Sequence, residues 1–513
     1  MRQLAFASAL VLSAAVIASV VVAPAAAKRR PPPPPPPPPP SSSSTYVTNY
    51  ANVLNGVKCY SVTPEDVQAT SDGGSIALAH SDCRSVSWVI KSDAYGNPQW
   101  QKEVACFGLP DGGYALGLSL QQTADGGYVI GGGTRDCQSS PICPYLTSQE
   151  CGLIVKLDAA GNIVWSRVYS SSVRNTGFED VRQTSDGGFV AVGTFVDENS
   201  DIGSLVLKVD SAGNVQWQRL IGPAGRTHAL LNAVQQTTDG GYVAAGTFYT
   251  ASDSGQAGVF VVRLDSTGNV AWQRGFNSFD PSGVPTANEF VSSVIQTSEG
   301  GYVVAGAWGD TLPGTCCQGP LLLKLDATGA IQWQKAYSGG IHCFFNGYWT
   351  QCYAVGGLAY SVHQTSDGGF ALGGAGHVKF TDSLPMVPWL AKTDASGNLV
   401  WQHDYYDTNP ASGRTLSQYF ASSSPTSDGG YLALGFTENP VDLTGELFAV
   451  RTDSAGLLGG GCSQIHPATP LNAIDPGLTA IVPPFAVRAT KPAQGNLPAF
   501  TQPTSIQTTG GGC

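Results

Sequence analysis

The chain has 513 residues and a formal net charge of −11, and only 12% of its residues are charged. Nucleic acid is excluded as a partner because phosphate binding requires clustered Lys and Arg, which the part of the chain with strand-like patterns lacks. Sixty-three glycines, together with many Thr, Ser, Val and Tyr residues, indicate an all-β protein with many tight turns.

Residues 1–27 have the pattern of a secretory signal peptide. Arg2 supplies the positive start, Leu4 to Ala23 is almost wholly apolar, and Ala25 to Ala27 offers small residues for cleavage. The apolar length also approaches that of a membrane anchor, which is the alternative. No later stretch is apolar for long enough to cross a bilayer. We expect a secreted, periplasmic or cell-surface protein without a transmembrane segment after signal removal.

Residues 28–45 form a Pro/Ser-rich linker with ten consecutive prolines, Pro31 to Pro40, followed by four serines. Ten prolines favour polyproline II and make a stiff spacer of roughly 30 Å. The linker is either such a spacer or a low-complexity segment without a partner.

Seven copies of a two-part phrase occupy the region from Tyr46 to Leu458. The first half reads like VRQTSDGGFVAVGT, and its acids are Asp72, Asp125, Asp186, Asp239, Glu299, Asp367 and Asp428. By subtraction, these acids lie 53, 61, 53, 60, 68 and 61 residues apart. The second half reads like LVLKVDSAGNVQWQR, with turn acids at Asp93, Asp158, Asp210, Asp265, Asp326, Asp394 and Asp453. Two hairpin signals per unit and this period predict a seven-bladed β-propeller of four-stranded blades.

The fixed positions of each unit have structural explanations. Six units carry a Trp seven residues after the second turn acid, as in Trp165 and Trp217, and large rings at equivalent points wedge neighbouring sheets together. A Lys or Arg precedes that acid by two residues in every unit, as Lys208 precedes Asp210. Because ligand sites usually break symmetry, we interpret the acid as a turn cap and the Lys as lying along the sheet.

The ends of the repeat region predict how the ring closes. The seventh unit lacks its fourth strand, since Gly460 stands where Trp is due. Before the first unit, Tyr46 to Tyr50 matches Trp165 to Tyr169 in pattern. We therefore expect the N-terminal strand to complete the last blade and remove the open sheet edges.

These phrases resemble the secreted bacterial and archaeal repeat proteins that carry QTSDGGY followed by KLDxxGNxxWQK. The family is usually grouped with the quinoprotein-like (PQQ-like) propellers, and the resemblance covers roughly 410 residues. It implies the propeller fold but no particular activity. Quinoprotein dehydrogenases of similar DxxGNxxW motif have eight blades and a calcium site. Here the units number seven, and the adjacent Cys316 and Cys317 lie in a variable loop.

Because the blade cores repeat, we expect function in the loops that differ. The connection from Ser338 to Val355 is the candidate ligand site, with Trp308 in the preceding loop. Rigid rings with amide and imidazole groups suit a carbohydrate or an extracellular protein. The alternative is a loop that a disulfide holds together and whose aromatic side chains pack within the protein instead of binding a ligand. The candidate ligand-binding residues are Trp308, His342, Phe344, Phe345, Asn346, Tyr348 and Trp349.

Twelve cysteines after an export signal predict disulfides. The expected pairs are Cys343–Cys352, Cys462–Cys513 and one pair among Cys137, Cys143 and Cys151. The Cys462–Cys513 pair would tether residues 459–513, a Gly/Pro-rich tail. We find no CxxC or HExxH spacing and no pair of acids that stands apart from the turn acids, so the sequence predicts no catalytic residue, metal site or cofactor.

The sequence as a whole predicts an exported, monomeric, non-catalytic β-propeller that serves as a binding or surface-interaction module. The alternative is a propeller enzyme, either a quinone-dependent oxidoreductase or a carbohydrate-active enzyme. Several ordered acids that converge on the propeller axis would favour the enzyme.

Overall fold

The computed structural model describes much of the chain between Thr45 and Thr509. The chain divides into two units, Met1–Pro37 and Pro38–Cys513, and all described residues belong to the second. The predicted signal peptide and nearly all of the predicted linker lie outside them. The described ranges are 45–54, 57–58, 62–81, 86–106, 114–135, 150–170, 175–196, 202–223, 228–249, 257–278, 287–310, 318–338, 341–345, 350–354, 357–376, 387–405, 418–438, 445–458, 465–467, 472–474, 478–481, 485–488, 493–496, 499–502 and 505–509.

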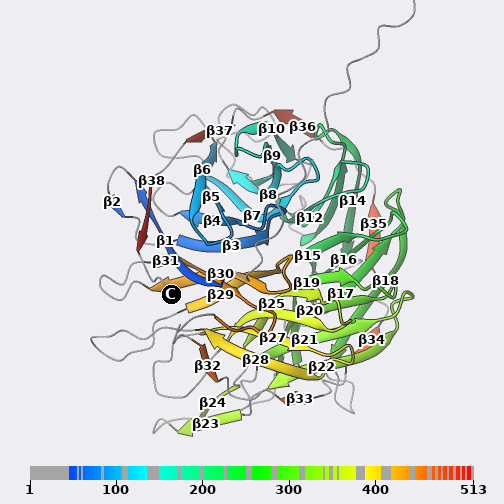
Figure 1. Ribbon diagram of the computed structural model, residues 1–513. Coiled ribbons are helices and arrows are strands. Elements are labelled where there is room, and N and C mark those ends of the chain that lie inside the picture. The colour runs from blue at the N-terminus through cyan, green and yellow to red at the C-terminus, as the bar shows by residue number, and fades with distance from the viewer. Residues whose placement is uncertain are drawn as a thin grey trace, which may run out of the picture. The chain divides into compact units, whose positions relative to one another are not determined.

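Seven antiparallel blades surround a common axis (Figure 1), which confirms the predicted seven-bladed β-propeller. The innermost strands are β3 (Val62–Ala69), β7 (Tyr114–Gln122), β11 (Asn175–Gln183), β15 (His228–Gln236), β19 (Ala287–Gln296), β25 (Leu358–Gln364) and β29 (Gln418–Pro425). The second strands are β4 (Ser75–Ser81), β8 (Tyr128–Arg135), β12 (Phe189–Val196), β16 (Tyr242–Tyr249), β20 (Tyr302–Asp310), β26 (Phe370–Gly376) and β30 (Tyr431–Glu438).

The outer strands complete each blade. The third strands are β5 (Val86–Ser92), β9 (Glu150–Leu157), β13 (Ile202–Val209), β17 (Ala257–Leu264), β21 (Gln318–Leu325), β27 (Val387–Thr393) and β31 (Gly445–Thr452). The fourth strands are β6 (Pro98–Cys106), β10 (Ile163–Ser170), β14 (Val215–Pro223), β18 (Val270–Ser278), β22 (Ile331–Ser338), β28 (Leu399–Tyr405) and β1 (Tyr46–Leu54). A single parallel bridge, Val86 to Ala115, joins the first two blades.

The ring is closed as predicted, because β1 pairs with β31 in the last blade. Tyr46 takes the place of the missing Trp: its ring lies against Gly96, as Trp100 lies against Gly161. Tyr50 donates its hydroxyl to Gly96 O at 2.8 Å, and Tyr169 makes the equivalent bond to Gly213 O at 2.8 Å. The N-terminal strand therefore reproduces the side-chain contacts of an ordinary fourth strand.

The C-terminal tail adds a fifth strand to every blade, which the sequence analysis did not predict. It visits the blades in reverse order, from the sixth to the first and then to the seventh. Its strands are β32 (Ile465–Pro467), β33 (Asn472–Ile474), β34 (Leu478–Ile481), β35 (Phe485–Arg488), β36 (Ala493–Asn496), β37 (Ala499–Gln502) and β38 (Ser505–Thr509). Two smaller elements lie beside the blades: β2 (Val57–Lys58), which pairs with β1, and the hairpin of β23 (Ile341–Phe345) and β24 (Thr350–Ala354).

Interactions at the two Gly-rich turns of each blade explain why every repeat carries an acid and a base at fixed positions. In the third blade, Asp186 accepts hydrogen bonds from Thr184 Oγ1 and the Gly188 amide, and it forms a 2.9 Å ion pair with buried Lys208. Asp210 caps its own turn through the amides of Ala212 and Asn214. Asp210 is thus the expected turn cap, and Lys208 reaches the other turn of its own blade. Seven such ion pairs, one per blade, stabilise one face of the propeller.

Aromatic rings join neighbouring blades, as expected. Trp100 meets Tyr128 of the next blade edge-on, with ring centroids 5.8 Å apart. The same Trp covers Gly161, whose φ of +77° favours glycine and where a methyl group would lie 2.8 Å from the indole. Equivalent edge contacts between blades involve Trp165, Trp217, Trp272, Trp333 and Trp401.

Candidate active site

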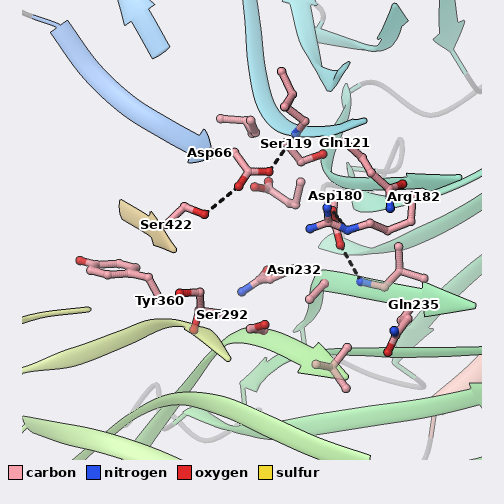
Figure 2. Close-up of a pocket in the computed structure, with 18 of the residues that line it drawn as sticks. Asp66, Ser119, Gln121, Asp180, Arg182, Asn232, Gln235, Ser292, Tyr360 and Ser422 are labelled. Carbon is pink, nitrogen blue, oxygen red and sulfur yellow. Dashed lines mark hydrogen bonds and ion pairs between the residues drawn. The ribbon is translucent and has the colours of Figure 1, made fainter. Parts of the chain in front are cut away.

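A cavity of about 770 Å³ lies on the propeller axis. All seven innermost strands line it, so it is the central channel of the ring rather than a cleft between loops. Figure 2 shows Asp66, Asp180, Arg182 and Tyr360 around this space. Most of the lining is polar, in contrast to the apolar faces between the blades.

A β-bulge lies in the innermost strand of every blade. In the third blade, Phe178 opposes Gly193 and Asp180 opposes Val192, so Glu179 has no partner on β12. The same register shift occurs in the other six blades. The extra residue lines the cavity in each case, and the seven are Glu65, Leu118, Glu179, Asn232, Ser292, Tyr360 and Ala421.

In six of the seven blades a glycine permits the close approach of two strands that accompanies the bulge. A methyl group at Gly193 would lie 1.8 Å from the carbonyl oxygen of Gly177 on the bulged strand. Five other blades have the same close approach, at Gly132, Gly246, Gly306, Gly374 and Gly435. The first blade differs, because Ala79 faces Pro64 there. Glycine thus admits the inner strand's carbonyl, and the bulge turns one side chain toward the axis.

Two blades place adjacent acids at this bulge. Glu65 and Asp66 stand in the first blade, and Glu179 and Asp180 stand in the third. The other five blades carry Leu118-Ser119, Asn232-Ala233, Ser292-Ser293, Tyr360-Ser361 and Ala421-Ser422. Four acids therefore converge on one axial cavity, in a ring whose other members are mostly neutral.

The second acid of each pair links neighbouring blades. Asp66 accepts the amide of Leu120 in the next blade at 2.9 Å and the hydroxyl of Ser422 at 2.7 Å. Asp180 likewise accepts the amide of Val234 at 2.9 Å. Ser119 accepts the equivalent amide, that of Val181, with its hydroxyl at 2.8 Å. Because a serine performs this role in the second blade, the Asp66 and Asp180 carboxylates act as inter-blade acceptors.

Glu65 has a different environment. It is half-buried and accepts no hydrogen bond from the described residues. Burial, followed by repulsion from Glu179 and Asp66, raises the pKa of Glu65 to about 8. Its carboxyl group is therefore protonated near neutral pH and holds a proton that it can donate.

Arg182 and His363 complete the titratable lining. Arg182 Nε lies 3.1 Å from Asp180 Oδ1, and burial raises the pKa of Asp180 although Arg182 opposes that shift. His363 Nε2 lies 2.6 Å from the Ser423 carbonyl oxygen, and burial lowers the pKa of this imidazole. Since a carbonyl only accepts, Nε2 carries the proton and the neutral ring keeps Nδ1 as an acceptor.

Of the residues that sequence analysis proposed, Trp308 is described and does not line this cavity. Trp308 belongs to strand β20, where it pairs with Glu289 and Gly319 and packs between the fourth and fifth blades. His342, Phe344 and Phe345 lie in β23, outside the blades. Asn346, Tyr348 and Trp349 lie outside the described residues. The structure therefore separates Trp308 from the axial acids and gives no side-chain geometry for the hairpin.

The cysteine predictions are only partly within the described chain. Cys343 and Cys352 face each other in the register of β23 and β24, and their bridge stays a prediction. Cys151, in β9, is disulfide-bonded, and Cys137 and Cys143 lie outside the described residues. Cys316, Cys317, Cys462 and Cys513 also lie outside them.

A signal for the axial acids was present in the sequence. Asp66 and Asp180 both stand six residues before a turn acid, Asp72 or Asp186, and each follows a Glu. Alignment of the seven units at the turn acid shows that only two carry this pair. The axial acids were not predicted because the sequence analysis expected function in loops of variable length and not at positions of the repeated strand that differ between units.

Two searches of the described residues bear on other classes of protein. No group of three or more His, Cys, Asp or Glu side chains in these ranges is placed to hold a metal ion. Among the same residues, no helix is long and apolar enough to cross a membrane.

The fold and the cavity define a β-propeller with an acid-lined axial site. No protein-family model and no curated protein matches the sequence. Among solved structures, the chain is similar to an α-L-arabinanase of Penicillium chrysogenum complexed with arabinobiose, at 10% identity, with a TM-score of 0.40, over 81% of this chain and 100% of the other. It is also similar to a β-1,3-galactosidase of family GH43, at 12% identity and a TM-score of 0.30, over 82% of this chain and 97% of the other.

The expectation of a non-catalytic binding module with its ligand on the loop face is wrong. Four acids converge on the axis, which is the arrangement that the sequence analysis expected of an enzyme rather than of a binding module. The enzyme alternative replaces that expectation, and its carbohydrate-active form is the subject of the proposal below. Membership of the quinoprotein-like group stays a prediction, and the function is argued below from the cavity itself.

Proposed function

We propose that the protein is a carbohydrate-active enzyme that hydrolyses a glycosidic bond in the axial cavity. The observation that supports this is the presence of Glu65 and Glu179 in the lining of one polar channel, where burial and the charge of Glu179 raise the pKa of Glu65 to about 8. Glycoside hydrolysis generally needs one carboxylic acid with a raised pKa and one carboxylate. The predicted export signal would place this activity outside the cytoplasm.

The roles follow from the two environments. Glu65 donates its proton to the glycosidic oxygen, so that the leaving sugar departs as a neutral alcohol. Glu179 stabilises the positive charge that develops on the sugar and either accepts a proton from the attacking water or attacks the anomeric carbon itself. In both routes one water molecule is consumed and Glu65 regains a proton by the end of the cycle. The anomeric configuration of the first product distinguishes the two routes.

Asp66 and Asp180 are less suited to these roles. Each already accepts a backbone amide from the next blade, and Asp180 also faces Arg182. A carboxylate that completes such contacts loses them when it changes its protonation state. Glu65, in contrast, accepts no inter-blade bond from a main-chain amide of the described residues.

Purified protein incubated with chromogenic arabinosides, galactosides and other glycosides, and with the corresponding polysaccharides, tests the proposal. We expect release of the chromophore or reducing sugar from at least one substrate, and a loss of about 10²- to 10⁴-fold in Glu65→Gln, the range for removal of a general acid. Glu179→Gln should lose a comparable factor.

Asp66→Ser is the matched control, because it copies Ser119 of the second blade at the equivalent position. It should keep the rate within about tenfold, since a hydroxyl can accept the inter-blade amide. Absence of hydrolysis across the whole panel, or equal rates in wild type and Glu65→Gln, would contradict the proposal.

A further inference from the structure

One side of the cavity carries Tyr360 of blade six, and Tyr419 of blade seven lies near this residue. Tyr360 is the bulge residue of β25 and lines the cavity, where Figure 2 shows it beside Ser292 and Ser422 and away from Arg182. Tyr419 lies two residues before the bulge of β29, and its charge interactions include both Glu65 and Tyr360. Tyr419 thus lies near both Tyr360 and the proposed acid of the adjoining first blade.

The two rings differ in how they are held. Tyr419 stacks on Phe436 with centroids 5.6 Å apart and an interplanar angle of 20°, so one of its faces is covered. Its other face meets no aromatic ring in the described part of the chain. Tyr360 has no aromatic partner among the described residues and is only half-buried. Tyr360 therefore lines the cavity without another ring of the described residues against it, and Tyr419 is held by a ring on one face.

Their hydroxyl groups are also free of protein partners. No hydrogen bond to either hydroxyl is present within the described ranges, whereas Tyr50, Tyr169 and Tyr337 all donate to turn carbonyls. Burial, together with the charge of Glu65 and then Tyr360, raises the pKa of Tyr419 to about 12, so its hydroxyl stays a donor at neutral pH. An aromatic ring with a free phenolic donor suits a ligand that is apolar on its faces and polar at its edge.

From these contacts we infer that Tyr360 and Tyr419 form a stacking subsite for a neutral sugar ring beside Glu65. The inference rests on the proposed function for the class of ligand, and it adds the wall of the cavity on which the sugar lies. Pyranose and furanose rings have C–H faces that pack on aromatic rings and hydroxyl edges that bond to polar groups. Ser292 and Asn232 line the channel on the next blades, where Ser292 Oγ donates to the Ala359 carbonyl and Asn232 Nδ2 to the Val291 carbonyl, so their oxygen atoms remain as acceptors for that edge.

The charges of the cavity indicate a neutral rather than an acidic sugar. Arg182 is the only Lys or Arg among its described lining residues, and it is already opposite Asp180. Asp66 and Glu179 leave the remaining lining negative, so the carboxylate of a uronic acid would be repelled. Neutral pentose or hexose rings avoid that cost.

Binding is measured in the Glu65→Gln background, where turnover does not interfere, by saturation-transfer NMR and calorimetry. The probes are methyl glycosides of neutral pentoses and hexoses, with methyl glucuronoside as the acidic comparator. We expect at least one neutral probe to bind, and its affinity to fall about tenfold in Tyr360→Ala and in Tyr419→Ala. The Phe variants of the same positions keep the ring and should stay within about threefold. Tyr95→Ala removes an exposed ring on a turn and serves as the control.

The outcomes separate the two proposals. If neutral probes bind and the Ala variants weaken them while wild type hydrolyses nothing, the stacking subsite stands and the proposed hydrolase activity fails. If wild type hydrolyses glycosides but both Ala variants bind like Tyr95→Ala, the subsite is wrong and the hydrolase activity stands. Binding of the glucuronoside alone, or of no probe, would also overturn the subsite.

Discussion

The Gly-rich turn that follows each innermost strand is the same in all seven blades, whereas the bulge within the strand differs between blades. At the Gly-rich turn, every blade repeats one arrangement: an acid, a buried Lys or Arg, and a glycine with positive φ. A few residues earlier, at the bulge, the seven blades carry six different side chains, Glu occurring twice. The residues that are the same in every blade stabilise the ring, because every blade needs the same turn. Positions that differ between blades are not fixed by the fold and can carry a catalytic group. We therefore expect function in the bulge ring, which is the set of seven bulge residues, rather than in the ion-pair ring, which is the set of seven ion pairs at the turns.

The largest effect expected from this comparison is on activity. Glu65→Leu copies the second blade at the bulge and should abolish hydrolysis, with a loss of at least about 10²-fold, because no proton donor remains at that position. Its fold should be intact, since Leu118 occupies the same position in a stable blade. Steady-state hydrolysis and a circular dichroism spectrum check both statements. Retained activity in this variant would mean that the bulge ring does not carry the reaction.

At the turn end, the same kind of change should affect stability instead. Asp186→Asn removes the partner of buried Lys208, and we expect a loss of about 1–3 kcal/mol in the free energy of unfolding. Denaturant unfolding measures it, with exposed Gln332→Ala as the neutral control. Activity per folded molecule should stay at the wild-type level. A variant that lost activity while keeping its unfolding midpoint would reverse the distinction between the two rings.

Two turn glycines separate backbone strain from inter-blade packing. Gly187 and Gly161 have φ of +78° and +77°, but a methyl group at Gly187 meets nothing within 4 Å, whereas one at Gly161 meets Trp100. Gly187→Ala should cost about 1–2 kcal/mol from the left-handed backbone alone. Gly161→Ala should cost about 1–3 kcal/mol more, because the Trp must also move. Equal costs in unfolding experiments would show that the Trp contact contributes nothing.

The smallest effect expected is a dependence of stability on pH. The pKa of Glu65 is raised to about 8 from an ordinary 4.5, so unfolding releases its proton between these values and stability falls as pH rises from about 4.5 to 8. Asp367 is opposite: hydrogen bonds from Lys392 and Thr365 lower its pKa to about 2, so its contribution is lost as pH falls from about 4 toward 2.

Melting temperatures from pH 2 to 9 test both signs. Glu65→Gln should raise the melting temperature by about 2 °C at pH 8 and leave it unchanged at pH 4. Asp367→Asn should lower it at pH 7 and not at pH 2. The alkaline limb of the rate profile should lie near the pKa of Glu65. A wild-type rate that is flat from pH 6 to 9 would exclude Glu65 as the proton donor.

The architecture was readable from the sequence because it rests on repetition. Turn glycines, Trp residues and the match of Tyr46–Tyr50 to Trp165–Tyr169 predicted seven blades and their closure, and the pairing of β1 with β31 confirms both. Each of these signals is local, or depends on a comparison between copies. The bulge was not predicted, because it depends on a contact between two strands. In six blades a glycine on the second strand leaves room for a carbonyl oxygen of the innermost strand.

The axial acids were not predicted for a related reason. Convergence of Glu65 and Glu179 requires the ring to bring the first and third blades to one axis, 114 positions apart by subtraction of their numbers. The loop residues from His342 to Trp349 attracted attention because rings and cysteines are conspicuous in sequence. A carboxyl pair within a repeated strand is visible only after the units are aligned. The outer strands of the tail escaped prediction too, since each is at most five residues long and prolines recur between them.

The pairing of β1 with β31 also has a consequence for the order of assembly. Tyr46 must wait for Arg451, about 400 positions later, before it finds its neighbour. Blades one to six can form from contiguous sequence as the polypeptide emerges, whereas the seventh is assembled from both ends of the ring. Such a distant contact slows folding, since the intervening chain must be brought together first. Export across a membrane before this step would therefore deliver an open arc, and the acid-lined channel would come into being only at its destination.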